Sequence, residues 1–125
     1  MKAYTRYLMN LLDSMDVTAH FDPGCNPFAR GKMICVPDPS NLLSFAICMH
    51  ELGHIATQAT EQKPASWYEQ LRADKSAVDE YVMTGEINAW AWAEKRMKQR
   101  GWWTDAVEEH MWYALGTYTA KRPGW

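Results

Sequence analysis

The segment SFAICMHELGHIAT, residues 44–57, decides the fold of this 125-residue chain. Apart from a thiol, the only ionisable side chains between Phe45 and Ala56 belong to His50, Glu51 and His54. A helix over this segment would be apolar on nearly every side, which is typical of a helix buried in a core. Burying two imidazoles and a carboxylate without partners would cost roughly several kcal/mol. A bound cation would remove that cost.

The spacing of the three polar residues matches the H-E-x-x-H pattern of zinc enzymes. Residues four apart lie on one helix face, so His50 and His54 can present both imidazoles to one ion. Glu51 stands about 100° further round the helix, where its carboxylate can accept a proton from a water molecule on that ion. With three specified positions the pattern also arises by chance, so an accidental match is one alternative.

Composition restricts the class of protein. The length predicts a single domain over residues 1–125, and 47% hydrophobic residues predict a globular one. A net charge of −2 gives no basic excess for nucleic acid or an anionic membrane surface. We expect no membrane span, because no apolar run approaches about 18 residues, and the first residues lack the apolar core of a signal peptide. The three cysteines form no C-x-x-C pair, which favours a reduced, cytoplasmic protein.

The hydrophobic pattern predicts an α+β, mostly helical fold with a sheet of two or three short strands. The expected elements of the first half are a helix over about 3–13, strands over 17–22 and 31–36, and the buried helix over about 42–59, which Ser40 or Asn41 caps. The second half is expected to hold one or two helices over 66–83, a helix over about 86–99, and a last helix that begins after Thr104 and ends near Arg122. Residues 25–30 are predicted to be a loop, and Thr84-Gly85 to break the helical region.

A catalytic zinc takes three protein ligands and one open position, so a third ligand must come from elsewhere in the chain. The downstream candidates are Asp74, Asp79, Glu80, Glu86, Glu94, Glu108, Glu109 and His110. Glu86 is preferred because Ala89 and Ala93 share its helix face and would let two helix backbones approach closely. Asp79 and Glu80 stay open. Glu86 has a second explanation as a first-turn carboxylate stabilised by the helix dipole, which is worth about 0.3–1 kcal/mol.

Other polar residues are weaker candidates. His110 and Tyr113, three apart on the last helix, could stabilise an oxyanion, although packing and surface exposure are their commoner roles. His20 is expected to be an ordinary strand residue, and Cys48 a small buried apolar one. The strand over 31–36 is a candidate sheet edge to which an extended substrate could add; an edge merely protected by Lys32 and the flanking prolines is the alternative.

Two motifs resemble those of gluzincin-type zinc metallopeptidases, most closely the ImmA/IrrE-like group and related small phage proteins. They are MHELGH at 49–54 and Glu86-x-x-Ala89-x-x-Trp92-Ala93, and the two short strands before the buried helix agree with them. The resemblance covers about residues 17–100. It implies a minimal zincin-like domain in which His50, His54 and Glu86 bind zinc. One departure is that many such proteases carry a helix-turn-helix domain, for which these residues leave no room.

The implied reaction is hydrolysis of a peptide bond in a protein substrate, with Glu51 as the base that moves a proton from water to the leaving amine. The resemblance suggests a transcriptional repressor as the target. A non-catalytic, zinc-stabilised binding or inhibitor protein of a phage or mobile element is the alternative function. Neither the oligomeric state nor the substrate follows from the sequence.

Overall fold

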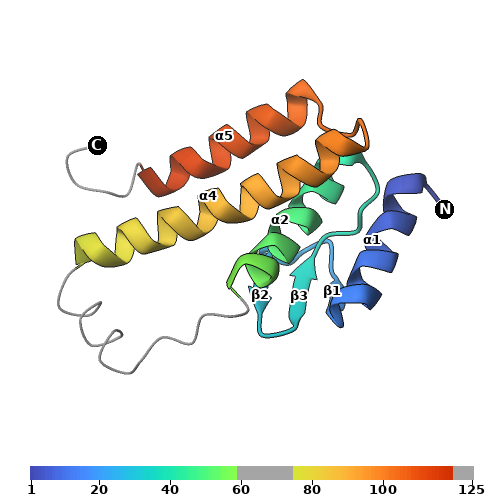
Figure 1. Ribbon diagram of the computed structural model, residues 1–125, viewed down its shortest axis with the longest axis horizontal. Coiled ribbons are helices and arrows are strands. Elements are labelled where there is room, and N and C mark those ends of the chain that lie inside the picture. Colours follow the sequence, from blue (N-terminus) through green and yellow to red (C-terminus); the bar gives the residue numbers. More distant parts are fainter. Residues whose placement is uncertain (59–74, 120–125) are drawn as a thin grey trace.

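The computed structural model describes the backbone of residues 1–58 and 75–119, and the side chains of residues 1–57 and 82–116. The elements, in chain order, are α1 (Ala3–Met15), β1 (Thr18–Phe21), β2 (Phe28–Arg30), β3 (Met33–Val36), α2 (Leu42–Gln58), α4 (Lys75–Gln99) and α5 (Asp105–Thr119) (Figure 1). The described part is therefore α+β and mostly helical, with one small sheet, as the sequence predicts. None of its helices is both long enough and apolar enough to cross a membrane.

The sheet has the strand order β1-β3-β2, with β1 parallel and β2 antiparallel to β3. The prediction of a loop over residues 25–30 is wrong, because β2 lies there. Three residues are too few to show the alternation that marks a strand. Gly31 has a φ of 59° and, with Lys32, connects Arg30 to its partner Met33 in a two-residue hairpin turn. The prediction that β3 is an edge strand is also wrong, because it pairs on both sides.

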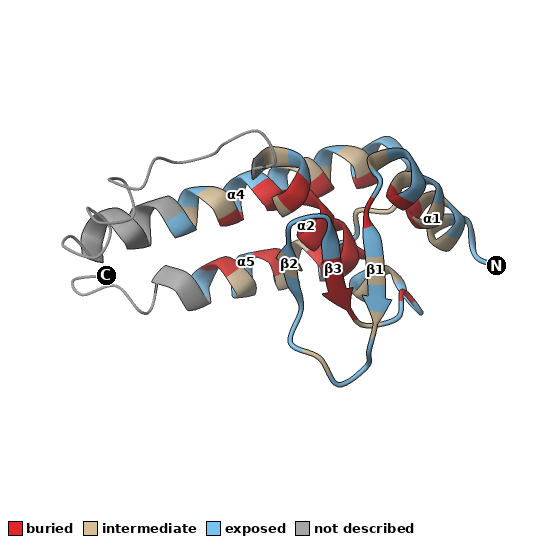
Figure 2. Cartoon of the chain, turned by 90° about the horizontal axis from the view of Figure 1, so that it is seen from below, coloured by how far each residue is buried: buried red, intermediate tan, exposed pale blue. Residues whose placement is uncertain are grey.

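Helix α2 is the centre of the fold. It begins after Asn41, whose side chain accepts a hydrogen bond from the backbone N–H of Ser44 at 2.9 Å, while the hydroxyl of Ser44 accepts one from the N–H of Asn41 at 3.1 Å. This reciprocal cap confirms one of the two predicted cap residues. Most apolar residues of α2 between Phe45 and Ile55 are buried against the sheet, α1, α4 and α5 (Figure 2), whereas Leu43, in the first turn, is exposed. The prediction of a buried helix is confirmed.

Helix α4 runs without interruption from Lys75 to Gln99, so the predicted break at Thr84-Gly85 is wrong. A glycine inside a helix costs only about 1 kcal/mol, and the buried side chains that follow it on α4 offset that cost. Glu86 therefore lies well inside α4 rather than in a first turn. The helix-dipole explanation of Glu86 fails for this reason, because that effect is confined to the first turn. The predicted helical residues 66–74 lie outside the described part.

The backbones of α2 and α4 come very close together at Gly53. A Cβ added to Gly53 would lie 2.5 Å from the backbone oxygen of Ala89, closer than real Cβ atoms ever approach. Glycine at position 53 is therefore what allows the two helices to pack so tightly. Glu86 lies one turn before Ala89 on α4, so this contact sets how far its carboxylate can reach towards α2.

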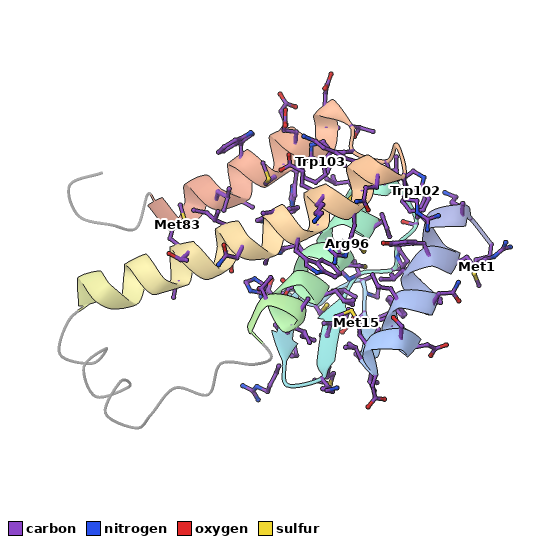
Figure 3. All side chains as sticks on the ribbon, in the orientation of Figure 1. Met1, Met15, Met83, Arg96, Trp102 and Trp103 are labelled. Atoms are coloured by element: carbon purple, nitrogen blue, oxygen red, sulfur yellow. The ribbon has the colours of Figure 1, made fainter. Side chains whose placement is uncertain are left out.

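The remaining helices complete the core on either side. Trp102, just after α4, projects towards α1 (Figure 3), and its ring centroid lies 5.4 Å from those of Tyr7 and Phe45 in edge-to-face contacts. Thr104 caps α5 by accepting a hydrogen bond from the backbone N–H of Val107 at 3.2 Å, and α5 begins directly after it, as predicted. Because α5 packs against both α2 and α4, all three helices meet around one buried polar cluster.

Candidate metal centre

The polar cluster brings together residues from two helices that are far apart in the sequence. The Nε2 atom of His50 lies 2.7 Å from Oε2 of Glu86, and Nε2 of His54 lies 3.1 Å from Oε1 of the same carboxylate. The exposed fractions of His50 and Glu86 are 9% and 8%, so the contact is shielded from solvent. One buried carboxylate thus bridges two imidazoles that α2 presents on one face.

The donor set fits zinc. Two imidazole nitrogens and one carboxylate oxygen are a known ligand set of catalytic zinc, and bond lengths near 2.0–2.2 Å place tetrahedral donor atoms about 3.3 Å apart. The observed 2.7 and 3.1 Å separations are shorter than that spacing by about 0.6 and 0.2 Å. On metal binding each Nε2 would have to be unprotonated, with the ring proton on Nδ1. The alternative ligands Asp79 and Glu80 have side chains outside the described residues.

Glu51 stands beside this donor set rather than within it. Its Oε1 lies 3.5 Å from Nδ1 of His50, the nitrogen that faces away from Glu86. Potential ligand atoms of His50, Glu51 and His54 fall within 4.8 Å of one another, and this is the one such group among the described residues. Because the Nε2 atoms of both histidines converge on Glu86, its carboxylate is the candidate third ligand, and Glu51 lies outside that set.

The two carboxylates have opposite electrostatics. Burial alone would raise the pKa of Glu86, but hydrogen bonds and positive charge from His50 and His54 outweigh it and lower the pKa to about 2. Burial also opposes the charged form of Glu51, and there it prevails, so the pKa of Glu51 is raised despite both histidines. Burial would lower the pKa of His54, yet the hydrogen bond to Glu86 raises it overall. The carboxyl group of Glu86 is thus ionised well below neutral pH, whereas that of Glu51 binds a proton more readily than an ordinary glutamate does.

A cavity of about 290 Å³ adjoins the cluster. It is lined by Pro27, Ile47, His50, Glu51, Glu86, Trp90, His110 and Ala114. His110, a candidate from the sequence, is therefore at the site, and burial together with the charge of His50 lowers its pKa. Its neutral ring can donate one hydrogen bond into the cavity near neutral pH. Tyr113 is 73% exposed and does not line the cavity.

Sequence reasoning missed two residues of the site. Trp90 stacks on His50, with ring centroids 4.4 Å apart and planes 11° from parallel. The sequence indicates only that Trp90 shares the helix face of Glu86, four residues earlier, and not that it stacks on His50. Pro27, just before β2, lies in the segment that was predicted to be a loop and reaches the cavity from the sheet side.

The other candidates lie away from the site. His20 is exposed on β1, opposite Cys35 of β3. Cys48 is fully buried, and its thiol donates a hydrogen bond to the backbone oxygen of Pro37 at 3.4 Å, as expected of a small core residue. Cys25 lies in the turn after β1 and belongs to no group of potential metal ligands among the described residues.

The function has to be inferred from this geometry, because comparison of the chain with protein-family models, curated proteins and solved structures finds no match in any of the three.

Proposed function

We propose that this protein is a zinc-dependent metallopeptidase. His50, His54 and Glu86 hold the zinc ion, and Glu51 is the general base. The observation that supports this most is the Glu86 carboxylate, which contacts Nε2 of both histidines from a different helix. An accidental H-E-x-x-H sequence would not require a buried carboxylate to converge on the same two nitrogen atoms.

Bound zinc supplies a Lewis acid that makes water acidic near neutral pH and polarises a carbonyl group. The protein's own residues do the rest. Glu51 accepts the proton of the attacking water at its carboxylate and delivers it to the leaving amine. Its raised pKa brings the carboxylate closer to the neutral range in which such a proton carrier works best. Glu86 stays charged throughout, since the pKa of its carboxyl group is far below neutrality.

His110 is the proposed second contributor. It lines the cavity from α5, opposite the residues of α2, and its lowered pKa keeps it neutral at the pH of the reaction. The N–H of a neutral imidazole can donate to the carbonyl oxygen as negative charge develops on it. Trp90 lies beside His110, with ring centroids 6.0 Å apart and planes at 66°, so the imidazole has a packed neighbour at the cavity wall.

A protein substrate would approach along the sheet. In the described part, β2 pairs only with β3, so its other edge can accept an extended polypeptide. Pro27 joins this strand to the cavity wall. The substrate edge that we propose is therefore β2, in place of the strand over 31–36. A transcriptional repressor remains the target that the resemblance suggests.

The test separates metal binding from catalysis. Protein purified without added zinc is analysed for metal, and new protein N-termini are compared between cells that express the wild type and cells that express Glu51→Gln. Glu51→Gln should retain zinc and abolish cleavage, whereas Glu109→Gln, a substitution at an exposed residue of α5, should retain both zinc and cleavage. If the wild type and both variants contained zinc and none of the three cleaved a protein, the result would favour the non-catalytic binding protein. Cleavage by Glu51→Gln at the wild-type rate would refute the mechanism.

A further inference from the structure

Trp90 has a more specific contact than an ordinary core residue. Its ring lies nearly parallel to that of His50 at 4.4 Å between centroids, and it also makes an edge-to-face contact with His110, which lines the same cavity. Only 2% of Trp90 is exposed, so the surrounding core fixes the position of its ring. The imidazole of His54 meets the ring of His50 at 64°, with centroids 4.6 Å apart. His50 is thus held between two rings.

We propose that Trp90 is a positioning residue that fixes the imidazole plane of His50 for metal binding. The proposal rests on the metal site described above. For zinc, Nε2 of His50 must face the Glu86 carboxylate, while Nδ1 stays on the side of Glu51. Rotation of the ring about its bond to Cβ would take Nε2 out of that plane, and the parallel indole opposes this rotation because the two faces would collide.

Helix α4 then controls the site in two ways from consecutive turns. Glu86 supplies a ligand atom, and Trp90, four residues later on the same face, orients a ligand that belongs to α2. A metal-bound imidazole gains partial positive charge, which the negative face of an indole attracts. The indole of Trp90 thus favours both the orientation of His50 and the positive charge that His50 gains on metal binding.

The indole acts through its plane and not through its polar atom. Nε1 of Trp90 is buried and has no hydrogen-bond partner among the described residues. A phenylalanine at this position would keep a flat face against His50 without that N–H, whereas leucine would fill part of the volume with no plane. The two substitutions therefore separate stacking from simple packing.

The experiment compares Trp90→Leu, Trp90→Phe and Trp92→Leu. Trp92 is a control on the same helix that is half-buried and packs against Arg96, whose guanidinium carbon lies 4.0 Å from a ring centroid. Zinc affinity is measured by competition with a chelator, and Co²⁺ binding by its visible absorption spectrum. Loss of a residue that orients a ligand typically weakens metal binding about 10–100-fold. We expect that loss, with an altered Co²⁺ spectrum, for Trp90→Leu only.

A metal-free measurement tests the stacking by itself. In zinc-free wild-type protein the ring protons of His50 should resonate upfield of those of exposed His20, because a parallel indole shields them, and this difference should persist in Trp90→Phe. It does not depend on whether Trp90→Leu folds.

Three results would overturn the proposal. They are unshifted His50 protons in the wild type, wild-type zinc affinity in Trp90→Leu, and equal losses in Trp90→Leu and Trp92→Leu. A wild type that binds neither zinc nor Co²⁺ would instead refute the proposed function.

Discussion

Replacing Gly53 with alanine should separate α2 from α4 and weaken the metal centre together with the fold. The added Cβ would lie 2.5 Å from the backbone oxygen of Ala89, whereas ordinary van der Waals contact begins at 3.4 Å. The helices would have to move apart by up to about 0.9 Å, since a backbone oxygen inside a helix has no freedom to rotate away. Overpacking of this kind costs about 1–3 kcal/mol, and the better helix propensity of alanine returns only about 1 kcal/mol.

The displacement matters for function because Glu86 is carried on the same part of α4. A shift of several tenths of an ångström would lengthen its 2.7 and 3.1 Å contacts with His50 and His54. Loss of a contact that supports a metal ligand typically weakens metal affinity about 10–100-fold, and we expect a loss of that order for Gly53→Ala. The assays are urea unfolding of the zinc-free protein and chelator competition of the zinc-loaded protein.

A matched control is available on α5. A Cβ on Gly116 would meet nothing within 4 Å, so Gly116→Ala should leave zinc affinity unchanged and stability equal or slightly higher. If Gly53→Ala behaved like Gly116→Ala in both assays, the contact between the helix backbones would not be what positions Glu86, and this account of the site would be wrong.

Two further predictions concern charge at the site. The pKa of Glu86 is lowered from its ordinary value of 4.5 to about 2, so the interactions of the charged carboxylate stabilise the zinc-free fold above pH 4.5 and are lost as the pH falls towards 2. The wild type should therefore be more stable than Glu86→Gln, and this difference in the free energy of unfolding, measured with urea in the presence of chelator, should narrow between pH 4.5 and pH 2. A difference that stays constant across this range would contradict the assignment. His110→Ala should retain zinc but lower the cleavage rate about 10²–10³-fold, the usual cost of removing one oxyanion donor; an unchanged rate would show that His110 only lines the cavity.

The main elements of the fold were predictable because each carries a strong local pattern. The apolar run over 44–57 has no stable place except the core, and α2 is there. The errors have physical causes. Strand β2 owes its existence to pairing with β3, a contact that local sequence does not encode. Gly85 resembles a helix break, yet packing on the following turns holds α4 together.

The candidate site, like the fold, could be predicted from the sequence only in part. The spacing of His50 and His54 was sufficient to place two imidazoles on one face, because helix periodicity is a local property. Glu86 required a second argument, namely that alanines on its face would allow close packing; the contact of Gly53 with Ala89 is where that packing occurs. The stack of Trp90 on His50 could not be predicted, since it depends on the rotation of α4 against α2 as well as on their distance.

These contacts make the two motifs a single structural unit. A buried helix can carry two imidazoles only if something satisfies them, and here the Glu86 carboxylate accepts from both. That carboxylate is itself buried, and the same two hydrogen bonds keep it charged. Because neither group is well accommodated without the other, removing either motif leaves unpaired polar atoms in the core. The absence of a side chain at Gly53 is what brings the two halves within hydrogen-bonding distance.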